Sequence, residues 1–318
     1  GGIYAYKVTS MGILNNSISQ NEINGYRGYG AAMEILNPQG GILVESNGMI
    51  SNSINATYGS AGSAMRILNP ISNVKVTDNH MNHNTASGSE FSYACFFLWD
   101  ALEQDVMVDR NRFIGNMAEY GAAFYSRNSN KLRVSNNIFF ENQAETAGGA
   151  IMLFEFLAKG DPDSPVYQEM KTQMPTAQVK STGSHACFVN NTFLVNEAGV
   201  RGGAVYTHVD VNYPVFFNSI FSGNTASFGK DIFSYGTVPI VLDHSNFNPA
   251  NIGGSYTGDD NIYCDPSFEE DSLHLASNSG CINAGTDTLM VDESPFCCPI
   301  TDICLLYTSD AADECVNV

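Results

Sequence analysis

The strongest constraint on the fold is a recurring tetrad, in which an apolar residue is followed by two variable residues and an asparagine. Successive copies begin 31, 32, 32, 26, 54 and 28 residues apart. Internal periods of about 20 to 50 residues indicate repeat architectures, because one small unit cannot bury its apolar face alone and must stack on its neighbours. The tetrads are ISQN, MISN, MNHN, FIGN, FFEN, FLVN and FSGN, and they end at Asn21, Asn52, Asn84, Asn116, Asn142, Asn196 and Asn224.

Two further tracks keep the same register as the tetrads. An asparagine lies two residues before each tetrad except the last, and a Gly-x-Ala motif lies 18 or 19 residues before most of the others. The asparagine track consists of Asn16, Asn47, Asn79, Asn111, Asn137 and Asn191, with Ser219 in the last copy. The Gly-x-Ala motifs begin at Gly30, Gly62, Gly121, Gly148 and Gly202.

The segments between the tracks alternate in polarity as strands do, for example NVKVTDN (73–79) and KLRVSNN (131–137). We therefore predict an all-β fold, a parallel β-helix of about eight coils with three short strands in each unit. Asparagine tolerates turn conformations, and its amide can bond the equivalent amide one coil away. Both asparagine tracks are thus predicted to form ladders, and the Gly-x-Ala motifs to supply small residues at tight turns.

The repeat also predicts the domain organisation. Residues 1–250 are expected to form the solenoid, and the doubled step is explained by a polar, proline-containing insertion at 158–184 that projects as a loop. The chain starts at Gly1 within a repeat, so we expect it to be a fragment, and the lack of a signal peptide carries no information about export.

The paired motifs GGAI (148–151) with FLVN (193–196), and GGAV (202–205) with FSGN (221–224), resemble the repeats of chlamydial polymorphic outer membrane proteins and related secreted proteins. The resemblance covers about residues 1–250, and the early copies drift from the pattern. It implies a right-handed, single-stranded, pectate-lyase-like solenoid. It also implies an exported protein, extracellular or displayed on the cell surface or outer membrane, with an adhesive role.

A second resemblance begins at DPSFEEDSLHLASNSGCINAGT (265–286), which looks like the closing module of secreted bacterial β-helix proteins. It implies that residues 251–303 cap the open end of the solenoid, where unpaired strand edges otherwise invite aggregation. In that family the chain continues toward an anchoring signal, so any membrane attachment is expected through an anchor that this sequence lacks. CLLYTSDAADE (304–314) instead resembles a translated sequencing adapter, and we predict that residues 304–318 are not native.

Charge limits the partners. The formal net charge is −19, and no basic run supplies a patch for nucleic acid or an anionic membrane surface. No stretch of about 18 apolar residues appears that could cross a bilayer as a helix. We expect a monomer whose partner is a surface polysaccharide or a protein of a host or neighbouring cell.

Two of the cysteines are placed as an exported protein would use them. Cys95 and Cys187 lie in apolar strand-like segments and are expected to be small core residues, while Cys264 and Cys281 flank the cap and could form a disulfide that staples it. The adjacent Cys297 and Cys298 could pair with each other or with residues beyond this sequence. No zinc-site spacing is present.

Parallel β-helices include polysaccharide lyases and hydrolases, and four residues of this sequence are candidates for catalysis. Arg110 and Arg133 occupy similar strand-to-turn positions and could stack on one face, and His208 with Asp210 alternates on one strand. A solvent-exposed structural role is the alternative for all four, and no serine–histidine–aspartate signature or phosphate-binding loop appears.

No cofactor is predicted, although the acidic groups Asp161/Asp163, Asp259/Asp260 and Glu269/Glu270/Asp271 leave a surface Ca²⁺ open. The sequence therefore favours an exported scaffold with an adhesive or carbohydrate-binding role. The alternatives are a polysaccharide lyase or glycoside hydrolase that acts on one solenoid face, and a structural stalk. Exposed aromatic residues would favour binding, and the candidates are Tyr26, Tyr29, Tyr58, Tyr206 and Tyr213.

Overall fold

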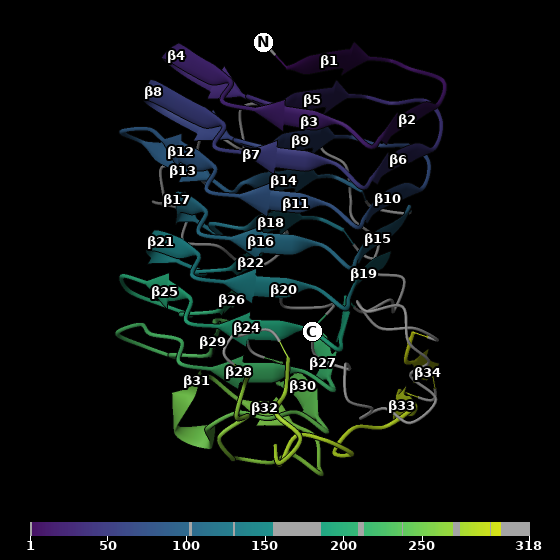
Figure 1. The fold of residues 1–318 in the computed structure, drawn as a ribbon, viewed down its shortest axis with the longest axis vertical. Coiled ribbons are helices and arrows are strands. Elements are labelled where there is room, and N and C mark those ends of the chain that lie inside the picture. Colours follow the sequence, from purple (N-terminus) through teal and green to yellow (C-terminus); the bar gives the residue numbers. More distant parts are fainter. Residues whose placement is uncertain are drawn as a thin grey trace.

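The computed structural model is a solenoid of short strands stacked in long parallel sheets (Figure 1). It describes residues 2–101, 104–129, 131–154, 186–208, 213–236, 238–269, 274–292 and 294–299. The predicted insertion 158–184, Asp210 and the predicted tail 304–318 lie outside the described residues. The prediction of a parallel β-helix is confirmed, because equivalent strands of successive repeats pair side by side in parallel register.

Two sheets run the length of the solenoid. Sheet A contains β1 (Ile3–Tyr6), β5 (Met33–Leu36), β9 (Met65–Leu68), β14 (Phe96–Trp99), β18 (Phe124–Arg127), β22 (Ile151–Phe154), β26 (Val205–His208), β29 (Ile232–Ser234) and β31 (Ile252–Gly253). Sheet B contains β2 (Met11–Leu14), β6 (Ile42–Glu45), β10 (Val74–Thr77), β15 (Asp105–Asp109), β19 (Lys131–Ser135), β23 (Cys187–Val189), β27 (Val215–Phe217), β30 (Ile240–Asp243) and β32 (Tyr256–Thr257).

Two further sheets complete the coils. Sheet C contains β3 (Ser17–Ser19), β7 (Gly48–Ile50), β11 (His80–Asn82), β16 (Arg112–Ile114), β20 (Ile138–Phe140), β24 (Thr192–Leu194) and β28 (Ile220–Ser222). Sheet D contains β4 (Glu22–Tyr29), β8 (Ser53–Ala61), β12 (Thr85–Ser87), β13 (Phe91–Tyr93), β17 (Met117–Tyr120), β21 (Gln143–Ala147) and β25 (Glu197–Ala198). The expectation of three strands per unit is therefore wrong for every coil that contributes to sheet D. In these coils the segment after the tetrad is long enough to form a fourth strand.

The interior is a stack of apolar side chains in register. The tetrad phenylalanines Phe113, Phe139, Phe193 and Phe221 form a column with ring centroids 5.0, 4.9 and 4.7 Å apart and nearly parallel planes. Each lies within the buried interior cluster, at an exposure of 4% or less. This column fixes the register of the coils, because a slip of one residue would turn every phenylalanine outward.

The asparagines of both tracks lie directly after a residue in the left-handed backbone region. Asn15, Ser46, Asp78 and Arg110 precede the first track with φ of +50 to +56°, as do Asn136, Asn190 and Asn218 in later coils. Asparagine and aspartate adopt this conformation more readily than other non-glycine residues. The turn residue thus makes the corner, and the next asparagine points inward.

Each buried asparagine links three coils. Asn79, for example, donates from its amide nitrogen to the Oδ1 of Asn111 at 2.9 Å and to the carbonyl oxygen of Val44 at 2.9 Å. Its backbone N–H also donates to the Oδ1 of Asn111 at 3.0 Å. The same pattern joins the tetrad asparagines, as between Asn84 and Asn116. These ladders satisfy backbone groups that the turns would otherwise leave buried and unpaired.

The ladders end in residues that the repeat pattern did not identify. The first track continues past Ser219 to Ser245 and then Asn261, whose Oδ1 accepts from the Ser245 N–H at 3.0 Å. The tetrad track ends at Asp231, which accepts from the amides of Asn224 and Asn251 at 3.0 Å. Burial raises the pKa of Asp231 above its usual value, although these two amide bonds oppose the shift.

The C-terminal segment closes one flank of the solenoid. The antiparallel hairpin of β33 (Thr288–Val291) and β34 (Ser294–Cys297) packs Leu289, Val291 and Phe296 against the outer face of sheet B. Cys187 belongs to this outer cluster together with Val189, Val215 and Phe217, whereas Cys95 lies in the interior. Cys187 is buried, as expected of a core residue. It does not lie in the interior of the solenoid, because its side chain points to the outer face of sheet B.

Candidate functional site

The outer face of sheet A carries aromatic side chains where a solenoid surface is ordinarily polar. On β14, Phe96 and Leu98 point into the interior cluster, and Phe97 and Trp99 belong to a separate outer cluster. Neighbouring side chains on a strand point to opposite faces. The same alternation turns Tyr125 outward on β18.

Sheet D contributes the other half of this outer cluster. The two sheets meet at the left-handed turns that begin the Gly-x-Ala motifs, among them Gly30 at φ +58° and Gly62 at φ +71°. We call the combined surface the aromatic strip. It comprises Tyr26, Tyr29, Tyr58, Phe91, Tyr93 and Tyr120 from sheet D and Phe97, Trp99, Tyr125, Phe154, Tyr206 and Phe233 from sheet A.

Ring contacts join the part of the strip from Tyr26 to Tyr125. Tyr26 stacks on Tyr58 with centroids 5.1 Å apart and planes 20° from parallel. Tyr58 meets the edge of Phe91 at 5.7 Å, and Phe91 stacks on Tyr93 at 5.4 Å. Tyr93 in turn contacts Tyr125 at 4.7 Å. The contacts therefore run from the first coil into the middle of the solenoid.

The strip carries its most exposed ring at the end on β4 and β8, which we call the open end. Tyr26 is 66% exposed, and Tyr29 and Tyr58 are half-buried beside it. Phe97 and Tyr125 farther along are 1% and 0% exposed. A ligand from solution thus has direct access to the strip on β4 and β8.

Arginines are concentrated on the strip. The guanidinium of Arg27 lies 4.8 Å from the ring centroid of Tyr58, and that of Arg66 lies 3.8 Å from Tyr29. Arg127 lies 4.1 Å from the ring of Trp99, and Arg201 lies 5.3 Å from that of Phe233. Four of the seven arginines of a strongly acidic chain therefore stack on this surface. Arginine at an aromatic face adds cation–π attraction and a planar set of hydrogen-bond donors.

The polar groups along the buried part of the strip are protonated phenols and partly buried acids. Burial raises the pKa of Tyr120 to about 12, and burial also raises the pKa of Tyr125, whose hydroxyl has no hydrogen-bond partner among the described residues. Desolvation likewise raises the pKa of Asp100 and of Glu119. At neutral pH the two phenols are hydrogen-bond donors rather than bases.

The predicted catalytic residues do not converge. Arg110 lies at a turn of sheet B, where its Nε and Nη2 reach Asp78 at 2.9 Å and its Nη1 contacts Asp109. Arg133 lies opposite Met107 in the strand register rather than opposite Arg110, and its Nη2 donates to the Cys297 carbonyl at 2.6 Å. The expectation that the two arginines stack is therefore wrong, because they occupy different register positions.

His208 lies on the other side of the solenoid, at the end of β26. Its ring makes edge contacts with Phe154 at 5.2 Å and Tyr235 at 4.8 Å, and the residue is 7% exposed. Its predicted partner Asp210 lies outside the described residues. His208 thus extends the aromatic strip rather than joining Arg110 and Arg133.

The structure describes three of the acidic residues considered for Ca²⁺, namely Asp259, Asp260 and Glu269. In the described part of the chain, no group of three or more His, Cys, Asp or Glu side chains is placed to hold a metal ion. Asp260 lies 3.6 Å from His244, and Asp259 donates its backbone N–H to Asp243 at 3.0 Å. Asp161, Asp163, Glu270 and Asp271 are outside the described residues.

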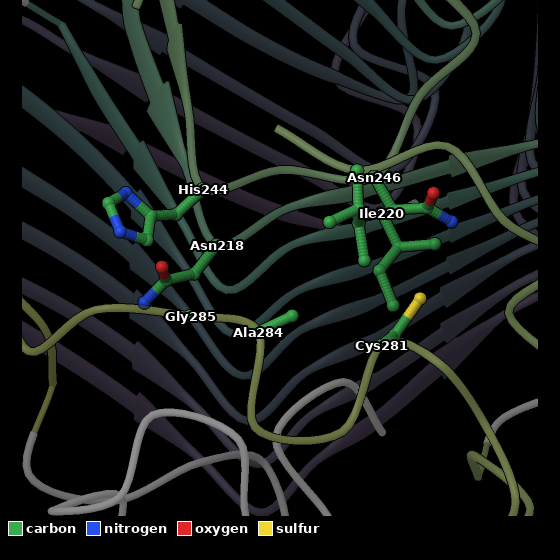
Figure 2. Close-up of a pocket in the computed structure, with 8 residues that line it drawn as sticks. Asn218, Ile220, His244, Asn246, Cys281, Ala284 and Gly285 are labelled. Carbon is green, nitrogen blue, oxygen red and sulfur yellow. The ribbon is translucent and has the colours of Figure 1, made fainter. Parts of the chain in front are cut away.

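Two cavities lie beside the described residues of the segment 262–285. The smaller holds about 20 Å³, and Figure 2 shows Cys281, Ala284 and Gly285 on one loop facing Asn218, Ile220, His244 and Asn246. This volume suits about one water molecule, so the cavity is a packing gap. The larger, of about 460 Å³, is lined by Asp231, Asn248, Asn251 and Tyr263 among others, and these four are paired with each other or with Asn224.

Sequence inspection identified part of the aromatic strip. Four of the five tyrosines proposed as exposed, Tyr26, Tyr29, Tyr58 and Tyr206, belong to it, although Tyr206 is 8% exposed. Tyr213 instead donates to Asp292 at 2.6 Å beside the C-terminal hairpin. Trp99 and the stacked arginines were missed. The run FFLW (96–99) was the available signal, since four consecutive apolar residues on a strand require both faces to be covered or used.

Comparison of the chain with protein-family models, with curated protein sequences and with solved structures finds no match in any of the three. In the part of the chain that the structure describes, no helix is long and apolar enough to cross a bilayer. The candidate site therefore rests on the geometry of the aromatic strip alone.

Proposed function

We propose that this chain is an exported or cell-surface β-helix scaffold that binds carbohydrate through the open end of the aromatic strip. The observation that carries the proposal is the exposed stack of Tyr26 on Tyr58, with the Arg27 guanidinium against the Tyr58 ring. A large exposed aromatic surface on a soluble protein is typical of an interaction site.

The chemistry of this surface suits a sugar. The flat, electron-rich face of a tyrosine ring attracts the C–H bonds on the face of a pyranose, and the phenol hydroxyl adds a polar contact at the ring edge. Arginine donates paired hydrogen bonds to vicinal hydroxyls or to a carboxylate. Because the stack rests on β4 and β8, both paired in sheet D, little ordering cost accompanies binding.

The rigid parallel scaffold favours an extended partner. Equivalent positions on successive coils repeat at about the strand spacing of 4.8 Å, so a polymer lying along the solenoid can contact several coils at once. We therefore propose a surface polysaccharide as the partner, with a monomeric scaffold. Catalysis is not proposed, because Arg110, Arg133 and His208 do not share a site and, among the described residues, no further group converges with them.

Replacement of both Tyr26 and Tyr58, the tyrosines at the open end of the strip, tests the proposal. We expect Tyr26→Ala with Tyr58→Ala to weaken binding to the best polysaccharide by about tenfold or more, since each lost stacking contact contributes roughly 0.5 to 1.5 kcal/mol. Affinity electrophoresis in gels that contain the polymer measures this directly.

The matched control is Tyr263→Ala, because Tyr263 is 68% exposed and lies beside Asn248 and Asn251, away from the strip. It should bind as the unmodified protein does. Equal retention of the double variant and the unmodified protein would refute a site at Tyr26 and Tyr58. If the protein bound a cell-surface protein and no polysaccharide, the partner would be a protein and the proposal of a glycan would be refuted.

A further inference from the structure

We infer that two disulfides fasten the C-terminal segment to the solenoid, one between Cys264 and Cys281 and one between Cys187 and Cys298. Of the six cysteines that the structure describes, Cys95 and Cys297 then remain as thiols. This inference is independent of the proposed glycan binding, because it concerns the opposite end of the molecule and the compartment in which the chain matures.

The first pair is already in contact. The Sγ atoms of Cys264 and Cys281 lie 3.8 Å apart as free thiols. Cys264 is held by the side chain of Asn246, which accepts from its N–H at 3.0 Å and donates to its carbonyl at 3.1 Å. Cys281 is anchored by a bond from its N–H to the Ser279 hydroxyl at 3.2 Å. A disulfide here would join the last coil, through Asn246, to the cap loop.

The second pair lies where the hairpin covers sheet B. Cys187 and Cys298 belong to the same apolar cluster. The Sγ of Cys298 bonds to the Oδ1 of Asn190 at 3.2 Å and the Nδ2 of Asn218 at 3.4 Å, which places it at the residue after β23, three residues along the chain from Cys187.

The alternative bond between the adjacent Cys297 and Cys298 is disfavoured by strand geometry. Successive side chains of an extended segment point to opposite faces. Cys298 faces the solenoid, and Cys297 is exposed on the other side with its carbonyl bound by Arg133. Cys95 is 0% exposed in the interior, near Asn84, and has no cysteine beside it among the described residues.

The chemistry is thiol–disulfide exchange with a small-molecule disulfide such as oxidised glutathione. The Cys264 thiolate attacks that disulfide, forms a mixed disulfide and releases one glutathione thiol. Cys281 then loses its proton, attacks the Cys264 sulfur and releases the second glutathione thiol, so two cysteine thiols are oxidised as one disulfide is reduced. Cys264 reacts first because it is half-exposed and lines the 460 Å³ cavity, whereas Cys281 is buried. The same exchange at Cys298 and Cys187 balances identically.

Peptide mapping of the full chain tests the connectivity. The protein is equilibrated in a glutathione redox buffer, its free thiols are alkylated under denaturing conditions, and the digest is analysed by mass spectrometry without reduction. We expect cross-linked peptides for Cys264 with Cys281 and for Cys187 with Cys298, and an alkylated Cys95. Any bond that joins one of these four cysteines to a different cysteine, or full alkylation of either pair, would overturn the inference.

Two single variants separate the pairs. Cys264→Ser should leave Cys281 alkylated and the Cys187–Cys298 link intact, and Cys187→Ser should do the reverse. Reduction of the unmodified protein should lower its thermal midpoint by on the order of 5 °C, because both cross-links restrict the unfolded chain. An unchanged midpoint would show that the cross-links do not fasten the segment. If a variant does not fold, the map of the unmodified protein still decides the pairing.

Discussion

Replacing Asn116 with alanine is expected to lower the free energy of unfolding by about 3 to 5 kcal/mol. The Oδ1 of Asn116 accepts from the backbone and amide nitrogens of Asn84 at 3.0 and 3.1 Å. Its Nδ2 donates to the Met81 carbonyl at 2.7 Å and to the Oδ1 of Asn142 at 2.9 Å. Alanine would remove all four bonds from a residue that is 0% exposed, and water cannot replace them.

Urea denaturation measures the effect, and Asn55→Ala is the matched control. Asn55 is an exposed asparagine on β8 whose side chain accepts only a long contact from Ser87 at 3.4 Å. Its replacement should change the free energy of unfolding by about 0.5 kcal/mol or less. If the two variants were equally stable, the ladder would be a consequence of stacking and not a cause of stability.

Replacing Gly202 with alanine is expected to destabilise the fold by at least about 2 kcal/mol. Gly202 has φ +67°, and an added Cβ would lie 2.2 Å from the carbonyl oxygen and 2.6 Å from the carbonyl carbon of Val205. Both are backbone atoms of β26, so the clash is relieved only by moving the strand away from its register.

Gly12→Ala provides the comparison for this turn. Gly12 lies on β2 without a left-handed φ, and nothing lies within 4 Å of an added Cβ. Alanine there should leave thermal stability unchanged or raise it slightly, since it reduces the freedom of the unfolded chain. If Gly202→Ala and Gly12→Ala had the same thermal unfolding midpoint, the turn at Gly202 would accept a side chain.

The turn at Ala94 shows that the repeat does not always place a glycine at the left-handed position of this turn. Ala94 stands where other coils have glycine and still adopts a positive φ, of +37°. The sequence YACF (93–96) therefore hid this copy of the track, although the backbone follows it. The periodic residues predicted the fold because stacking forces equivalent residues into equivalent places. The copy at Ala94 is one residue shorter than the copy at Gly121, and Tyr93 and Phe96 still pair with Tyr120 and Phe124.

The candidate site was less predictable because it depends on the outward face. In FFLW (96–99) every residue is apolar, so periodicity alone does not tell which pair points inward. The register of β14 with β9 and β18 decides it, and places Phe97 and Trp99 beside Arg66 and Arg127. Similarly, Arg110 and Arg133 looked equivalent in sequence, but the three-residue difference in their distance from the following ladder asparagine separates them in space.

Contacts between distant segments were beyond local inference. The hairpin at Thr288–Val291 and Ser294–Cys297 lies against β23 and β27, about a hundred residues earlier for β23, and no spacing rule connects them. The apolar outer residues of those two strands, Cys187, Val189, Val215 and Phe217, indicated only that something covers them.

The most direct test of the account is to incubate the protein with a panel of acidic and neutral polysaccharides, with and without Ca²⁺. Retention on the polymers is measured together with the release of reducing ends and the ultraviolet absorbance of unsaturated uronate products. A binding scaffold predicts retention on at least one polymer and no product above a heat-inactivated control. Turnover of any polymer above that control would contradict the account and identify an enzyme, and absence of both retention and turnover would remove carbohydrate as the partner.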